Sequence, residues 1–190
     1  MKFPVIALTC LASFAATVYS HPVANSLEQR DDDTFKSALK LALSDLGLVQ
    51  KGLHVYDGEH YFEFAEPAEI ARQHLSESAV KVRQSRPPFT EAGAADVKLL
   101  FKDLATASKT LLNELIVNKR TIEADSKCTY TSTYVGFIWA FSNGLVNDIV
   151  NNSGPKVKDL IGDYAGEYIS NLRSAVSGFE GSKCTNKSSQ

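Results

Sequence analysis

The stretch from Thr90 to Asn118 reads TEAGAADVKLLFKDLATASKTLLNELIVN. Its apolar residues recur at steps of three and four, which places them along one side of a helix with about 3.6 residues per turn. They are Val97, Leu100, Phe101, Leu104, Ala107, Leu111, Leu112 and Leu115. Thr90 is expected to cap the first turn, and Lys119 and Arg120 to complement the helix dipole at the end. Such a helix needs partners to bury its apolar stripe.

Four other stretches repeat the pattern. The first is predicted over 34–51 and ended by Gly52, and the second begins with Pro67 as its first residue and stops before Pro87. Residues 54–66 between them are interpreted as a loop. A further helix begins near Thr121, and the last runs from Val157 to Phe179 after a turn in which Ser153 acts as a cap. The sequence therefore predicts an all-α, up-and-down bundle of about five amphipathic helices.

Two of these stretches leave an alternative open. Residues 128–135 are rich in β-branched and hydroxyl side chains, which also suits a strand. We favour a helix because an isolated strand has nothing to pair with. The last helix contains or adjoins Gly162, Gly166 and Gly178, and these glycines either allow close helix contact or leave space beside the core.

The N-terminus has the layout of a secretory signal peptide over 1–20, with Lys2 before a short apolar run and small residues up to Ser20. We expect a flexible leader or short pro-segment over 21–33, with Arg30 as a candidate cleavage point, a single helical domain over 34–184 and a polar tail over 185–190. No second apolar segment reaches membrane length. The predicted location is secreted, either extracellular or in a cell wall.

Charge and cysteine usage narrow the class of protein. Removing Lys2 with the signal leaves 19 basic against 22 acidic side chains, which is no electrostatic footprint for nucleic acid. Cys10 leaves as well, so Cys128 and Cys184 are expected to form a disulfide in an oxidising compartment, with two buried free thiols as the alternative. Asn151 and Asn186 begin acceptor triplets for N-glycosylation.

The sequence contains few residues that indicate catalytic or metal chemistry. One cluster concentrates metal-type ligands, namely His54, Asp57, Glu59, His60 and Glu63, but it lacks the Glu-x-x-His pairs of a bundle di-metal site and is interpreted as a solvated loop. His74 is interpreted as a boundary histidine bonded to a backbone group. Nucleophile-elbow, phosphate-loop and zinc-protease motifs are absent from the sequence. We therefore expect a protein that is not an enzyme and that needs no metal or cofactor.

The apolar content has two interpretations, a well-filled core or helices that enclose an apolar pocket for a lipid chain. If a pocket exists, its lining should come from the apolar faces of the long helices, and a tyrosine hydroxyl would meet a carboxylate head group. The candidate ligand-binding residues are Leu100, Leu104, Leu111, Phe137, Phe141, Leu160, Tyr164 and Tyr168.

The order of these segments resembles a fungal family. The helices beginning FKSALKLALSDL at Phe35 and AADVKLLFKDL at Ala94, with the final helix from Tyr164 to Phe179, are similar to the hydrophobic surface-binding protein A and cell-wall galactomannoprotein group. The resemblance implies a secreted or wall-associated α bundle that binds fatty acids or hydrophobic surfaces. The Ser/Thr-rich stalk of its wall-anchored members does not occur in this sequence.

Three hypotheses follow. The leading one is a secreted or wall-associated, non-enzymatic protein that binds a fatty acid or another hydrophobic ligand or surface. The first alternative is a structural or adhesive surface protein, or a secreted effector, that contacts a cell-wall polysaccharide or a host protein and has no ligand cavity. The second is a small secreted hydrolase or metal protein that uses His54, His60 and Glu63.

Overall fold

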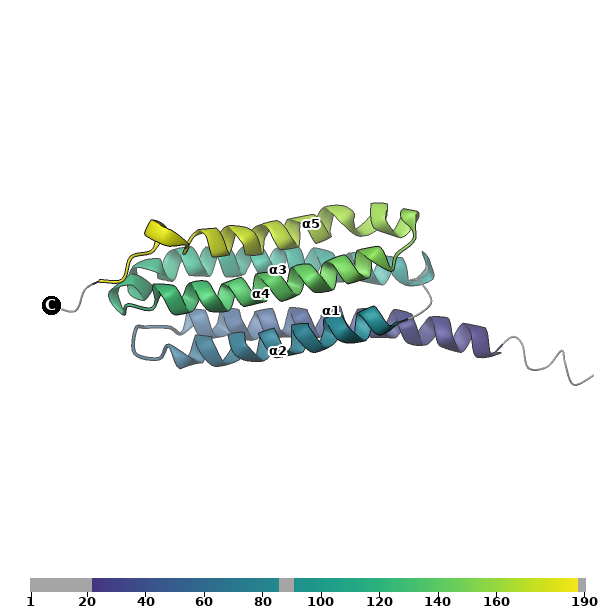
Figure 1. Ribbon diagram of the computed structural model, residues 1–190, viewed down its shortest axis with the longest axis horizontal. Coiled ribbons are helices and arrows are strands. Elements are labelled where there is room, and N and C mark those ends of the chain that lie inside the picture. The colour runs from purple at the N-terminus through teal and green to yellow at the C-terminus, as the bar shows by residue number, and fades with distance from the viewer. Residues whose placement is uncertain (1–21, 86–90, 188–190) are drawn as a thin grey trace, which may run out of the picture.

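The computed structural model describes residues 22–85 and 91–187, and these residues form five long helices and one short one (Figure 1). The long helices are α1 (Pro22–His54), α2 (Phe62–Gln84), α3 (Glu91–Ala124), α4 (Cys128–Asn151) and α5 (Pro155–Ser177), and the 3₁₀ helix η1 is Gly181–Lys183. The predicted all-α bundle is confirmed, and residues 128–135 are helical, as favoured above. In the described part of the chain, no helix is long and apolar enough to cross a membrane.

The helices alternate in direction along the chain but pack in a different order in space. Figure 1 shows α1, α3 and α5 running one way and α2 and α4 the other. α1 packs against α2 and α3, α2 also packs against α4, and α5 packs against α3 and α4. The five helices therefore form a closed ring in the order α1, α2, α4, α5, α3. The contact between α4 and α5 is the least extensive of the five.

The inside of this ring is filled with side chains from every helix. Large side chains that are less than 2% exposed include Phe35, Leu39, Leu46, Leu53, Phe64, Phe101, Leu104, Leu111, Leu115, Ile122, Ile138 and Tyr168. Their removal from water is the main source of stability for a bundle of this kind. The apolar stripe of the Thr90–Asn118 stretch contributes several of them, as its spacing predicted.

The ends of several helices differ from the sequence-based prediction. α1 starts at Pro22, twelve positions before the expected Thr34, because no glycine or proline interrupts the chain from Val23 to Leu46. The predicted signal peptide lies outside the described residues, as does Thr90 with its predicted cap. Cleavage after Arg30 stays a prediction. α3 continues to Ala124, so Lys119 and Arg120 are not in its last turn.

Gly52 does not end the first helix, and Pro67 does not begin the second. Gly52 lies inside α1, where a Cβ atom would stand 2.0 Å from the carbonyl oxygen of Glu63 in α2. Pro67 is inside α2 and has no N–H, so the Glu63 carbonyl lacks its usual helical donor four residues on. The glycine therefore allows the two backbones to approach closely, at the carbonyl that the proline leaves open.

The expected helix start near Thr121 is also wrong, because a turn separates α3 from α4 there. Ser126 has a φ of 58° in this turn, and α4 begins at Cys128. The chain after η1 packs onto the same turn. Asn186 Oδ1 accepts the Cys128 N–H at 3.0 Å, and the Lys187 N–H donates to the Glu123 carbonyl at 3.0 Å. This part of the predicted polar tail is thus held against the bundle.

The Cys128–Cys184 disulfide is confirmed, with the two Cα atoms 5.6 Å apart and a separation of 56 positions in sequence. It ties the C-terminal segment to the first residue of α4. In the chain-entropy model, a loop of this length is worth about 4 kcal/mol.

Ser153 is not an N-cap. Its hydroxyl is buried and donates back to the Ile149 carbonyl at 2.8 Å, and Gly154 precedes α5 without a side-chain cap. Serine hydroxyls often bond the carbonyl four residues earlier, which competes with capping.

The Gly52 contact gives a direct test of the packing between α1 and α2. Gly52→Ala is expected to lower the free energy of unfolding by at least about 2 kcal/mol, because the added methyl group meets a backbone oxygen rather than a movable side chain. The matched control is Gly47→Ala in the same helix, where a Cβ meets nothing within 4 Å. This control should gain about 0.5–1 kcal/mol from helix propensity. Urea denaturation followed by circular dichroism measures both variants, and equal effects would contradict the close approach.

Candidate functional site

A polar pair joins the neighbouring helices α1 and α2. The Asp45 carboxylate is 3% exposed, and the Nδ1 atom of His74 lies 3.1 Å from both of its oxygens. His74 is therefore bonded to a carboxylate and not to a backbone group, which corrects the prediction. Burial raises the pKa of the Asp45 carboxyl above its ordinary value, although the bond to His74 opposes this shift.

A second polar pair joins α4 to α5. The hydroxyls of Ser142 and Tyr168 lie 2.6 Å apart, and both residues are buried. Burial raises the pKa of the Tyr168 hydroxyl, and the nearby Asp45 carboxylate acts in the same direction. These hydroxyls satisfy each other inside the ring, as buried polar groups must.

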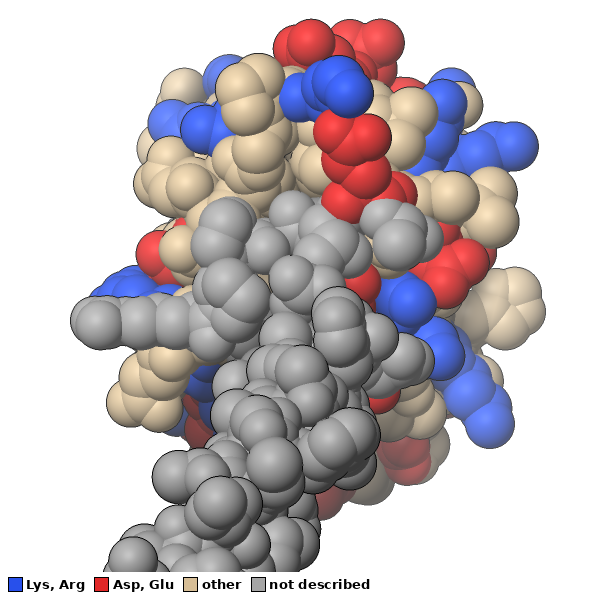
Figure 2. Space-filling view, turned by 90° about the vertical axis from the view of Figure 1, so that its right-hand side faces the viewer, with Lys and Arg blue, Asp and Glu red and all other residues tan. Residues whose placement is uncertain are grey.

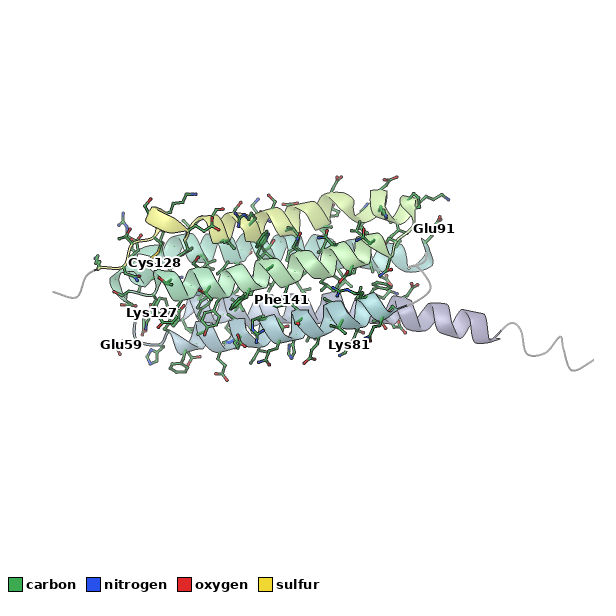
Figure 3. The ribbon with its side chains drawn as sticks, in the orientation of Figure 1. Glu59, Lys81, Glu91, Lys127, Cys128 and Phe141 are labelled. Atoms are coloured by element: carbon green, nitrogen blue, oxygen red, sulfur yellow. A yellow bond between two sulfur atoms is a disulfide. The ribbon has the colours of Figure 1, made fainter. Side chains whose placement is uncertain are left out.

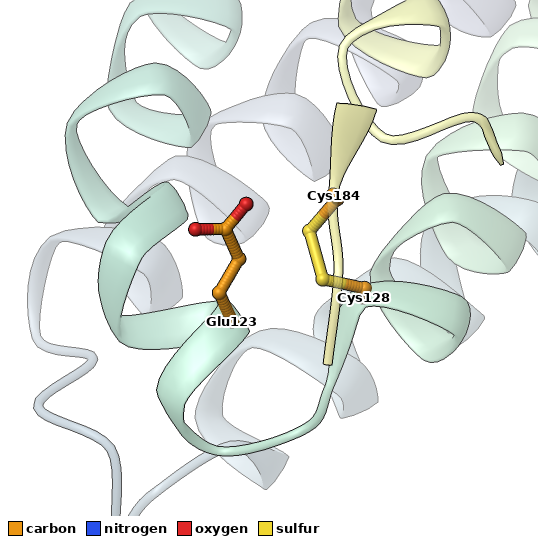
Figure 4. Close-up of side chains that lie close together, drawn as sticks. All are labelled: Glu123, Cys128 and Cys184. Atoms are coloured by element: carbon orange, nitrogen blue, oxygen red, sulfur yellow. A yellow bond between two sulfur atoms is a disulfide. The ribbon is translucent and has the colours of Figure 1, made fainter. Parts of the chain in front are cut away.

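The predicted metal-type cluster lies around the turn between α1 and α2 and is exposed. Asp57 uses its Oδ1 to accept the Glu59 N–H at 3.0 Å and lies 3.1 Å from His60 Nδ1, while His54 faces Glu114 at 3.8 Å. The Asp57 contacts lie within a solvated turn, and the His54–Glu114 contact joins α1 to α3. Glu123 does lie beside Cys128 and Cys184 (Figure 4), but both sulfurs are in the disulfide and offer no thiolate to a metal.

A groove of about 620 Å³ runs along the contact between α4 and α5. Its apolar lining comes from Val146 and Val150 on α4 and from Ala165 and Ile169 on α5. Gly162 and Gly166 also line it, and a Cβ on either glycine would meet nothing within 4 Å. Of the two alternatives given above for these glycines, close helix contact or space beside the core, the structure shows the second at Gly162 and Gly166. Since α5 lines the groove from Gly162 to Ser174, its length is about 18 Å.

One end of the groove carries an aromatic ring and a positive charge. Trp139 on α4 and Arg173 on α5 line this end, with the Arg173 guanidinium 4.8 Å from the centre of the indole ring. Glu180, just before η1, accepts a bond from Arg173 Nη1 at 3.2 Å. The indole Nε1 is buried and has no hydrogen-bond partner among the described residues. Asn143, Asn147, Ser170 and Ser174 complete the polar rim.

Six of the eight predicted ligand-binding residues belong to the hydrophobic core or pack against it. Leu104, Leu111 and Tyr168 are buried in the core, while Leu100, Phe141 and Tyr164 are partly buried against it. Phe137 and Leu160 are exposed by 42% and 38%. None of the eight lines the groove between α4 and α5. Their role in binding stays a prediction.

Sequence reasoning missed the groove because it looked for the largest apolar residues on each helix. Many of those residues fill the core, whereas the groove owes its depth to small residues on α5. Gly162, Ala165 and Gly166 lie on one face of α5 at helical spacing, and Arg173 follows two turns later. This run of small residues ending in a cation was the available signal.

Two other features of the surface are its glycosylation triplets and its charge distribution. Asn151 and Asn186 are both exposed, and their glycosylation stays a prediction. On the end of the bundle seen in Figure 2, Lys and Arg side chains are interspersed with Asp and Glu, so neither sign dominates this face.

The described residues thus define an all-α class of architecture, a ring of five helices with an open apolar groove between α4 and α5. No family model matches the chain, and no curated protein matches it. Solved structures do match in fold. One is Afmp4p in complex with palmitic acid, with 12% identity, a TM-score of 0.72, and coverage of 78% of this chain and 99% of that one.

A second match is ligand binding domain 1 of the Penicillium marneffei MP1 protein, complexed with arachidonic acids. It has 10% identity and a TM-score of 0.73, and covers 79% of this chain and 99% of that chain. Domain 2 of the same protein, with multiple arachidonic acids, has 12% identity, a TM-score of 0.61 and coverage of 76% and 96%. At these identities the similarity establishes a shared fold.

The buried Asp45 carboxyl makes a prediction about pH. Because its pKa is raised in the folded state, the folded protein keeps a proton that the unfolded chain loses from about pH 4 upward. This contribution to stability is complete below that pH and is lost as the pH rises through the folded-state pKa. Asp45→Asn should remove the effect, so the variant gains stability relative to the wild type as the pH increases. Urea denaturation across this range measures the difference, and parallel curves would contradict the assignment.

Proposed function

We propose that this protein binds fatty acids or related hydrophobic ligands in the groove between α4 and α5, without catalysing a reaction. The observation that carries the proposal is the combination of an apolar groove with a guanidinium at one end. An amphipathic carboxylic acid has the same two parts, an apolar chain and an anionic head. The volume of about 620 Å³ falls in the usual range for small-molecule sites.

The acyl chain would lie along Val146, Val150, Ala165 and Ile169, with Gly162 and Gly166 giving the groove its depth. Each methylene removed from water contributes about 0.8 kcal/mol. A groove of about 18 Å accommodates a long chain, so affinity should rise with chain length until the groove is filled.

The carboxylate would pair with Arg173. A guanidinium carries five N–H donors, and Glu180 accepts from Nη1, so donors remain for a second carboxylate. The stacking on Trp139 holds the guanidinium at the mouth of the groove. A fatty acid should therefore bind more tightly than the alcohol of the same chain length.

We also propose a family for this protein and a secreted or wall-associated location. Palmitic and arachidonic acids are the ligands named for the structures with this fold, which supports a fatty acid as the ligand here. Together with the resemblance of the helix sequences, this supports membership of the hydrophobic surface-binding protein A and cell-wall galactomannoprotein group. The signal-peptide layout over 1–20 supports a secreted or wall-associated protein.

The test is to fill the groove without disturbing the fold. Gly166→Leu adds a side chain where a Cβ meets nothing within 4 Å, so the helix should form at least as well as before. Palmitate affinity, measured by isothermal titration calorimetry, should fall by about tenfold or more because the leucine occupies the volume of the chain.

The matched control is Gly47→Leu, another helical glycine with open space, which does not line the groove. It should leave palmitate affinity unchanged. Arg173→Gln should weaken palmitate but not the matching fatty alcohol. Equal affinity in the wild type and Gly166→Leu would reject this groove as the site, and no palmitate binding by the wild type would reject the function.

A further inference from the structure

A second hollow, of about 670 Å³, opens at the end of the bundle where the turns between α1 and α2 and between α3 and α4 meet. It is lined by the aromatic rings of Tyr61, Phe62, Tyr130 and Tyr134, by Lys127, and by the carboxylates of Glu59 and Asp125. Figure 3 shows Glu59 and Lys127 at the same end of the molecule as Cys128. This aromatic hollow is separate from the groove between α4 and α5 and has a different chemistry.

The rings of this hollow already attract a cation. The Lys127 ammonium lies 5.4 Å from the centre of the Tyr61 ring and 5.5 Å from that of Tyr130. No carboxylate of the described residues forms an ion pair with it, so the two π faces are its charge partners there. Two such faces, with Glu59 and Asp125 at the border, make an environment for a positive group.

The walls of the hollow are held in place by contacts behind them. Tyr61 packs edge-on against Tyr56 and Phe64, and its hydroxyl lies 3.2 Å from that of Thr131. The Tyr56 hydroxyl donates to the Asp125 carboxylate. A site whose walls are fixed before binding loses little entropy when a ligand arrives.

The backbone beneath Lys127 is fixed as well. The Lys127 N–H donates to the Ile122 carbonyl at 2.9 Å, and the Ser126 hydroxyl donates to the Lys187 carbonyl at 2.9 Å. The disulfide next to this turn holds the C-terminal segment that makes the second bond. The lysine side chain can therefore exchange partners while its backbone stays in place.

The charges of Lys127, Glu59 and Asp125 disfavour ligands that carry a single charge. A plain cation would be repelled by Lys127, and a plain anion by Glu59 and Asp125. A zwitterion avoids both kinds of repulsion. Its anionic group pairs with Lys127, and its cationic group replaces the Lys127 ammonium over the aromatic rings. We propose that the aromatic hollow binds a phosphocholine group, with the phosphate on Lys127 and the trimethylammonium over the neighbouring rings of Tyr61 and Tyr130.

The experiment is a titration of the full chain with phosphocholine, choline and inorganic phosphate, followed by NMR chemical shifts of backbone amides. Phosphocholine should bind best and shift the amides of residues 125–134. Lys127→Ala should remove the preference for phosphocholine over choline. The phosphate loses its partner, and no ammonium group then competes with choline for the aromatic rings. Tyr130→Ala should weaken phosphocholine by about tenfold.

Tyr130 is 58% exposed, so its replacement should not affect folding. The matched control is Lys109→Ala, an exposed lysine of α3, which should bind like the wild type. Undetectable binding of phosphocholine, or equal binding by wild type and Tyr130→Ala, would overturn the proposal. Gly166→Leu should retain phosphocholine binding, which separates this site from the fatty-acid groove.

Phosphocholine reaches a protein either free or as the head group of a lipid, and a second measurement distinguishes the two. Flotation with phosphatidylcholine vesicles should recover the wild type but not Tyr130→Ala if the lipid head group is the source. Binding of free phosphocholine without flotation would assign the site to the soluble compound.

Discussion

Five helices must bury five apolar stripes at the same time, and this constraint governs the rest of the structure. The ring in the order α1, α2, α4, α5, α3 gives each stripe two neighbours and a shared interior. Closing the ring requires α1 and α2 to approach closely enough that only glycine fits at position 52. The contact between α4 and α5 completes the ring least tightly, because glycines and alanine stand there in place of large side chains.

The looseness of that one contact leaves room for the proposed fatty-acid site. Gly162 and Gly166 leave a groove there over a core that stays intact. The pair of buried Asp45 with half-buried His74 links α1 to α2, and the buried Ser142–Tyr168 pair links α4 to α5. Arg173 lies outside this core at one end of the groove, where its guanidinium is available to the proposed ligand.

The sequence predicted the structure correctly where a regular pattern of residues determines it. The spacing from Val97 to Leu115 predicted a buried stripe, and the even number of cysteines left after Cys10 predicted the disulfide. It was less informative at helix ends, because Gly52 and Pro67 act there through a contact between two helices. The candidate site was hardest to predict, since the groove depends on which residues of α4 face the small residues of α5.

The central claim is that an acyl chain lies between α4 and α5 with its carboxylate at Arg173. Trp139, the single tryptophan of the chain, lines that end of the groove and reports directly on the position of the ligand. The decisive measurement is the quenching of its fluorescence by fatty acids that carry bromine near the carboxylate or near the methyl end. The account predicts saturable quenching that is stronger with bromine near the carboxylate. Saturable binding with no quenching from either position would contradict it.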